Sequence, residues 1–284
     1  MSAKTVEFET APGVTASRAR LTLSATQRKP GWLEPRIWAP TATVFVIVAI
    51  LWQVIAALNP YILPSFVDVG VSLAADPTMY GKNFLITLQE VAVGAGSAII
   101  LGFFAAIVMS EFEIVERAVM PLIVLIMVTP VIAIAPALVV AFGFGMLPKY
   151  IITGIVVFFP VLVNSLAGLR GVDPRTLDVF RTLHATRWEI FRDLRLPGSM
   201  PYFFAGLRIS LPLAVVGAAV AEFVAAGTAA GLGSLVTTSA AQANLSVTWA
   251  AIFMLCLMGI LLIGGLAITR KRVLWWSDQE NSTH

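Results

Sequence analysis

RGVDPRTLDVFRTLHATRWEIFRDLRLPGSMP, residues 170–201, is a polar stretch between two long apolar blocks. A first helix is predicted from Asp173, which is a good N-cap, and from Pro174, which suits the first helical position. No helix breaker follows before Leu183, and His184 begins a predicted turn. The polar stretch therefore opens with a short helix and a turn.

A second helix is predicted directly after the turn. Thr186 and Glu189 have the spacing of a capping box, in which each side chain bonds the other residue's backbone N–H. Leu196-Pro197 is expected to stop this helix, because proline lacks an N–H and clashes with the preceding turn. The pattern is therefore helix, turn, helix and stop.

The first of these helices has an apolar and a charged part. Leu177 and Phe180 are three residues apart and share a face, whereas Arg175, Asp178 and Arg181 place charge on the rest. An apolar knob with a charged rim suits insertion into a groove of a partner. We interpret the polar stretch as a docking element.

The composition indicates a polytopic membrane protein. Of 284 residues, 58% are hydrophobic and only 12% are charged, which is far too apolar for a soluble domain of this size. The single cysteine, Cys256, lies in an apolar segment and excludes an intrachain disulfide.

Six apolar blocks are each long enough to cross a hydrocarbon layer of roughly 30 Å. They are Ile37–Leu58, Phe84–Met109, Ala118–Phe142, Tyr150–Leu169, Tyr202–Ala225 and Val247–Ile268. An even number of spans places both termini on one side of the membrane. The predicted fold class is an all-α protein with six transmembrane helices.

Basic residues indicate which side is cytoplasmic. Six arginines lie within the polar stretch and three basic residues follow the last block at 270–272, whereas the opposite loops have only Lys82 and Lys149. The loop 110–119 holds three glutamates against Arg117, but acidic residues have little influence on orientation. Both termini and the polar stretch are therefore predicted to be cytoplasmic.

The chain is predicted to divide into an N-terminal tail (1–36), a six-span domain (37–269) and a C-terminal tail (270–284). The N-terminal tail is polar, is expected to be flexible, and has no apolar core that resembles a signal peptide. A short interfacial helix is predicted near Phe66–Ala75. Glycines 227, 231 and 233 predict a turn-rich external loop between the fifth and sixth spans.

The polar stretch resembles the cytoplasmic EAA loop of the permease subunits of bacterial binding-protein-dependent ABC importers. The Glu-Ala-Ala positions of that loop, its glycine and its later Leu-Pro fall on Asp178, Val179, Phe180, His184, Leu196 and Pro197. Asp178 keeps the acidic charge, whereas His184 replaces a glycine that adopts a left-handed turn more cheaply. The resemblance extends from about Leu51 to Leu235.

The resemblance implies a multi-subunit importer in the bacterial inner (plasma) membrane. The implied partners are a cytoplasmic ABC ATPase, which would bind ATP and magnesium, an extracytoplasmic solute-binding protein and a second copy of this chain. The ATPase contact would fall on Leu177, Asp178, Val179, Phe180, Arg181, Thr182, His184 and Ala185. This chain would then be a transport subunit of type I importer fold without a cofactor of its own.

Candidate residues for the translocation pathway or gate lie within the spans. Glu90 and Glu222 are predicted at the same depth near the outer mouth, and charges within spans usually point inward. Thr129-Pro130 lies in a proline-rich span that its prolines are expected to bend, and spans broken in this way tend to line pathways. Asn164 is expected to bond a neighbouring helix or a solute. Arg208 is expected to snorkel toward the membrane surface.

The substrate is interpreted from the same resemblance. Permeases for sulfonates, taurine and nitrate look similar over the whole chain but typically have a basic residue at the position of Glu90. The pattern from Thr87 to Glu90 looks more like the branch that imports thiamine-precursor pyrimidines or riboflavin. A carboxylate suits a neutral or amino-bearing ring better than an anion. The alternative is a sulfonate, taurine or nitrate.

Several other functions have no support in the sequence. The chain has no P-loop motif, and its two histidines, His184 and His284, have no ligand cluster around them. The arginines of the polar stretch are explained by topology, so no nucleic-acid partner is expected. An ion-coupled secondary transporter is the competing class, with Glu90 and Glu222 as candidate coupling carboxylates.

Overall fold

The computed structural model describes residues 35–224 and 231–275, and regular structure in these ranges is helical, which confirms the all-α fold. The chain forms two compact units, residues 1–51 and 52–284. The predicted tails lie largely outside the described residues: only Pro35 and Arg36 of the first and 270–275 of the second are described.

Five helices are long and apolar enough to cross a membrane. Their bounds are α1 Pro35–Leu58, α3 Pro77–Glu111, α6 Met146–Arg170, α9 Leu196–Val224 and α11 Leu245–Val273. Each contains a predicted block, except that Ala225 lies outside the described residues. The helices extend past the blocks because polar caps, such as Asp76 before α3, lie beyond the apolar residues.

The proline-rich block Ala118–Phe142, predicted as one span that its prolines bend, is divided into two helices. These are α4 (Glu113–Val128) and α5 (Val131–Phe142), which meet at an angle of 98°. The bend falls on Thr129, with φ −74° and ψ 125°, because a residue before proline is driven out of the helical region. The chain has a sixth span only if this bent pair crosses as one unit.

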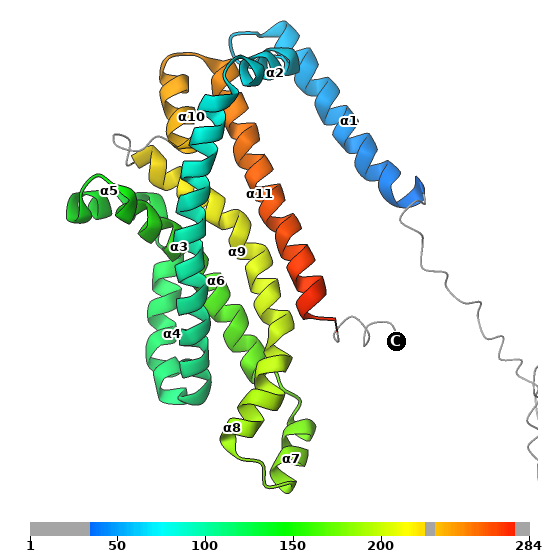
Figure 1. Ribbon diagram of the computed structural model, residues 1–284, viewed down its shortest axis with the longest axis vertical. Coiled ribbons are helices and arrows are strands. Elements are labelled where there is room, and N and C mark those ends of the chain that lie inside the picture. The colour runs from blue at the N-terminus through cyan, green and yellow to red at the C-terminus, as the bar shows by residue number, and fades with distance from the viewer. Residues whose placement is uncertain (1–34, 225–230, 276–284) are drawn as a thin grey trace, which may run out of the picture. The chain divides into compact units, whose positions relative to one another are not determined.

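Three helices form the core of the unit 52–284. Helix α6 packs between α3 and α9 (Figure 1). Small residues allow this approach: a Cβ on Gly94 would lie 2.8 Å from the Tyr150 carbonyl oxygen, and one on Gly168 would lie 3.0 Å from Ser199 Cα. Small residues at helix contacts are typical of membrane proteins, in which close van der Waals packing replaces hydrophobic association.

Two short helices lie at the end of this core opposite α7 and α8 (Figure 1). The first, α2 (Phe66–Ala75), confirms the predicted helix and begins with a capping box between Ser65 and Asp68. The second, α10 (Leu232–Ala241), corrects the predicted turn-rich loop. Gly231 and Gly233 provide space for a side chain described below, and Gly227 lies outside the described residues.

Candidate functional site: the helical hairpin and a buried polar network

The first hairpin helix, α7 (Pro174–Thr182), forms as its sequence predicts. The Asp173 side chain caps it by accepting from the backbone N–H of Arg175 at 3.0 Å, and Pro174 takes the first helical position. Local capping signals therefore suffice to place the start of α7. We define the hairpin as residues 170–201.

The turn after α7 keeps the geometry that a glycine would give. His184 has a φ of 58°, in the left-handed region. Its N–H donates to the Arg181 carbonyl at 3.0 Å, and the Ala185 N–H donates to the Phe180 carbonyl at 3.0 Å. These two bonds form a Schellman motif, which satisfies the last carbonyls of the helix. The substitution of His184 for glycine therefore preserves the turn at the cost of a left-handed non-glycine residue.

The second half of the hairpin does not stop at Leu196-Pro197, contrary to the prediction. Thr186 and Glu189 form the expected capping box around α8 (Arg187–Glu189), and a π-helical turn, η1 (Ile190–Arg195), continues directly into α9. The N–H of Leu196 donates to Phe191, five residues earlier. The wider turn accommodates Pro197, which would clash in a regular α-helix. One helical run thus extends over 38 residues, Arg187–Val224.

The exposed apolar surface of the hairpin differs from the predicted knob. Leu177 and Phe180 are half-buried, and Leu177 lines a cavity of about 360 Å³ between the hairpin and the end of α3. Val179, Leu183 and Trp188 are 56%, 73% and 66% exposed. Leu183 and Trp188 were not among the predicted contact residues, because helical periodicity alone does not show which face the rest of the chain covers.

The remaining predicted contact residues lie at the hairpin surface or near it. Asp178 and Arg181 form an exposed ion pair at 3.2 Å. Thr182 and His184 are exposed, and Ala185 is half-buried. The hairpin therefore presents exposed apolar side chains beside a charged pair.

Two ion pairs connect the hairpin to the end of α3 and the first turn of α4, which are helical where a loop over 110–119 is predicted, with a break only at Phe112. Arg195 contacts Glu111 at 2.9 Å. Arg170 pairs with Glu116 and also donates to the Met109 carbonyl at 3.1 Å. Glu111 and Glu116, two of the three glutamates in this segment, are thus counter-ions of hairpin arginines. The hairpin and the junction of α3 and α4 therefore lie at the same end of the core.

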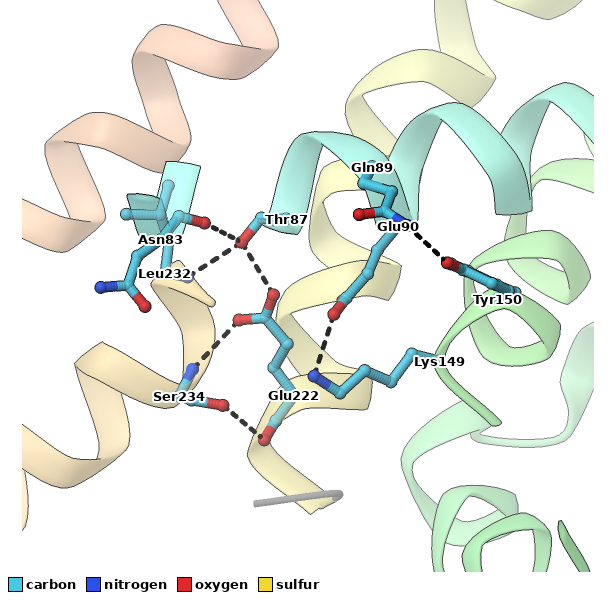
Figure 2. A network of polar contacts seen from close by, with 9 residues as sticks. All are labelled: Asn83, Thr87, Gln89, Glu90, Lys149, Tyr150, Glu222, Leu232 and Ser234. Atoms are coloured by element: carbon cyan, nitrogen blue, oxygen red, sulfur yellow. Dashed lines mark hydrogen bonds and ion pairs between the residues drawn. The ribbon is translucent and has the colours of Figure 1, made fainter. Parts of the chain in front are cut away.

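A buried polar network lies at the opposite end of the core (Figure 2). Glu222 of α9 is fully buried, and its carboxylate accepts from the Thr87 hydroxyl of α3 at 2.7 Å and from the Ser234 N–H at 3.1 Å. The Thr87 oxygen accepts from the Leu232 N–H at 2.8 Å. The carboxylate therefore sits at the N-terminus of α10, where backbone donors and the helix dipole favour negative charge. The network joins α3, α9 and α10.

A buried ion pair lies beside this network. Lys149 Nζ donates to Glu90 Oε1 at 2.9 Å, and both side chains are 0% exposed (Figure 2). Among the described residues, Glu90 Oε2 has no hydrogen-bond partner. The carboxyl groups of Glu90 and Glu222 are close enough to repel each other electrostatically. Lys149 offsets that repulsion.

Glu90 and Glu222 are both fully buried, so neither carboxylate is exposed to a solute in this conformation. Lys149, predicted as a residue of an external loop, is the buried counter-ion of Glu90. One signal could have found it: a carboxylate inside a span requires a partner, and Lys149 directly precedes the fourth apolar block. Because Lys149 pairs with this carboxylate, the charge of Glu90 does not favour an amino-bearing substrate over an anion.

Gly231 makes room for Glu222. A Cβ at Gly231 would lie 1.9 Å from Glu222 Oε1, and one at Gly233 would lie 2.8 Å from Glu222 Oε2. Because glycine has no side chain at these two positions, α10 can bring its N-terminal N–H groups up to the carboxylate.

The other predicted pathway residues lie elsewhere. Thr129 and Pro130 form the exposed bend between α4 and α5, and the Thr129 hydroxyl donates to the Leu125 carbonyl at 3.0 Å. The Asn164 amide donates to the Pro160 carbonyl of its own helix at 2.8 Å, so the expected bond to a neighbouring helix is wrong. Its side chain instead packs against Gly206 of α9.

Comparison with known proteins places this architecture in a family. The family model described as "Binding-protein-dependent transport system inner membrane component" matches residues 98–275. A formylaminopyrimidine transport permease protein from Halalkalibacterium halodurans is 33% identical, over 87% of this chain and 97% of the relative.

More distant relatives are named for other substrates. A riboflavin transport system permease protein from Chloroflexus aurantiacus is 25% identical, over 85% of this chain and 91% of the relative. A taurine transport system permease protein from Escherichia coli is 26% identical, over 87% and 92%. With the family match over most of the membrane helices and the hairpin, these likenesses show that the chain belongs to the inner membrane components of binding-protein-dependent transport systems and is a permease subunit of an ABC importer.

Proposed function

We propose that this permease imports a pyrimidine of the thiamine-precursor type or a similar aromatic nitrogen heterocycle. The observation that supports the pyrimidine is the 33% identity to a formylaminopyrimidine permease over 97% of that protein's length, against 25% to a riboflavin permease and 26% to a taurine permease. Because Glu90 is paired with Lys149, the proposal rests on the relatives and not on an exposed carboxylate.

We further propose that the hairpin receives the ATPase subunit and drives the transport cycle. The side chains of Val179, Leu183 and Trp188 provide apolar contact, and the pair Asp178–Arg181 provides the charged rim. The other predicted contact residues, Leu177, Phe180, Thr182, His184 and Ala185, complete this surface. ATP and magnesium belong to the ATPase, whose closure would displace the hairpins of two copies of this permease.

The helical run after Thr186 gives this displacement a route through the membrane. It leads without a break from the hairpin to Glu222, which lies 32 residues after Ile190, the first residue of η1. A tilt of this run would shift Glu222 relative to Thr87 and the α10 N-terminus. The buried network would thereby serve as a gate on the side that receives solute from the binding protein. Thr129, Pro130 and Asn164 are proposed to line the pathway between the two ends.

In the proposed orientation, the chain crosses the bacterial inner membrane with its hairpin and both termini in the cytoplasm. The arginines of the hairpin and the basic residues at 270–272 support this orientation by the positive-inside rule. Labelling of Thr182→Cys in a Cys256→Ser background tests it, since reagent should reach that cysteine only from the cytoplasmic side.

The substrate is tested in proteoliposomes that contain the permease, its ATPase and its binding protein. ATP-dependent uptake of formylaminopyrimidine, undiminished by ionophores, is the expected result. Preferential uptake of taurine or another sulfonate would replace the proposed substrate but leave the importer intact. Uptake that needs an ion gradient and no ATPase would instead indicate a secondary transporter.

A further inference from the structure

A pocket lies between two of the membrane helices, and none of its lining residues has a role in the proposed transport cycle. It has a volume of about 380 Å³ and is lined by two groups of residues, Phe204 and Arg208 from α9 and Ile263, Leu266, Ala267, Arg270 and Lys271 from α11. The two helices lie side by side (Figure 1). The α11 residues follow the spacing i, i+3, i+4, i+7 and i+8, so they share one face.

The pocket gathers three cations and no acid. Arg208, Arg270 and Lys271 are exposed, and within the described residues none of them forms an ion pair. Three positive charges around one cavity repel one another, and an anion bound among them would remove that cost. The electrostatics of the pocket therefore favour an anionic group.

The apolar walls specify what carries that anion. Ile263 lies about 10 Å along α11 from Arg270, at 1.5 Å per residue, so the pocket has an apolar part deeper in the span and a cationic part at the helix end. Phe204 and Leu266 add apolar surface. A phosphate with hydrocarbon chains matches this division, whereas a small hydrophilic anion would leave the apolar walls unmatched.

We propose that this pocket binds the phosphate headgroup of an anionic phospholipid from the leaflet on the hairpin side, with an acyl chain along Ile263 and Leu266. Basic pockets between membrane helices on the cytoplasmic side are suited to such headgroups. Arg208, which lies within the span, then finds its counter-charge in the lipid. The proposal does not depend on the transported substrate.

The test measures lipid retention by the purified full-length chain in neutral detergent, using native mass spectrometry and the shift in Tm. Dioleoyl phosphatidylglycerol, dioleoyl phosphatidylcholine and inorganic phosphate are added separately. Phosphatidylglycerol should be retained and should raise Tm, and the other two should not. Each single change, Arg208→Gln, Arg270→Gln or Lys271→Gln, should weaken retention about fivefold.

A matched triple variant controls for net charge. Arg175→Gln, Arg192→Gln and Arg272→Gln together remove the same three charges from outside the pocket and should leave retention of phosphatidylglycerol unchanged. Equal retention of the two lipids, or an equal loss in this variant and in a pocket triple variant that combines Arg208→Gln, Arg270→Gln and Lys271→Gln, would overturn the site. Stabilisation by inorganic phosphate to the same extent would assign the pocket to a free anion instead. If the pocket triple variant has a low Tm before lipid is added, the exposed single variants at 270 and 271 decide the result.

Discussion

Thr87 and Glu222 are 135 positions apart in the chain, yet their side-chain oxygens lie 2.7 Å apart in the interior. The same hydroxyl oxygen accepts from the Leu232 N–H, so one threonine joins three helices. Loss of this hydroxyl would leave a buried carboxylate and a buried N–H with one partner fewer, and such groups are costly inside a protein.

Thr87→Val should lower the free energy of unfolding by about 1–3 kcal/mol. Thr153→Val is the matched control, because Thr153 is equally buried and its hydroxyl has no hydrogen-bond partner among the described residues. That control should be neutral or stabilising. Denaturation in mixed micelles measures both, and equal effects of the two substitutions would show that the Thr87 bond contributes nothing.

Lys149→Met should destabilise the chain strongly, by about 3–5 kcal/mol, because it leaves the Glu90 carboxylate buried without its counter-ion. Glu90→Gln combined with Lys149→Met should cost less than the sum of the two single changes, since neither charge is then left alone. A double-mutant cycle on unfolding free energies checks this. Strictly additive costs would mean that the pair is not coupled.

Gly231→Ala should lower both Tm and transport activity. Its Cβ would lie 1.9 Å from Glu222 Oε1, so the carboxylate or the start of α10 must move. Gly259→Ala is the control, since nothing lies within 4 Å of a Cβ there and alanine favours the helix. Thermal unfolding of the two variants should separate them, and a wild-type Tm for Gly231→Ala would refute the close approach.

Exchanging the charges of Arg195 and Glu111 should preserve the ion pair between these two positions. Arg195→Glu alone places two acids together and is expected to reduce coupled uptake several-fold by loosening the hairpin from α3. Adding Glu111→Arg should restore most of the uptake. The exposed pair Arg117–Glu113 provides the control, because its reversal should change nothing measurable. Failure of the double variant to recover would indicate that the arginine acts through another partner.

Local signals made much of the hairpin predictable. Asp173, Thr186 and Glu189 act on backbone groups within three residues, so their roles follow from spacing alone. The pairing of Lys149 with Glu90 spans 59 positions and depends on how α3 and α6 pack, which apolar patterning does not fix. The continuation through Pro197 likewise depends on a π-helical turn that has no simple sequence signal.

The sharpness of the bend at Thr129 and the hidden face of α7 could not be predicted from the sequence, for related reasons. A proline in an apolar block is compatible with a kink or a break, and only the surroundings decide between them. The half-buried positions of Leu177 and Phe180 follow from the cavity that the hairpin makes with the end of α3. The most exposed apolar side chain of the hairpin, Leu183, therefore offers the cleaner test of docking.

The central claim, that the hairpin transmits the work of the ATPase, is tested most directly by ATP-driven solute uptake of the Leu183→Asp variant in the reconstituted importer. Leu183 is 73% exposed, so the change should leave folding and membrane insertion intact. Ile114→Asp, at another highly exposed apolar residue (84%) in the first turn of α4, is the matched control. We expect uptake to fall at least about tenfold for Leu183→Asp, as for loss of a buried apolar contact at an interface, and to stay normal for the control. Normal uptake by Leu183→Asp would contradict the account.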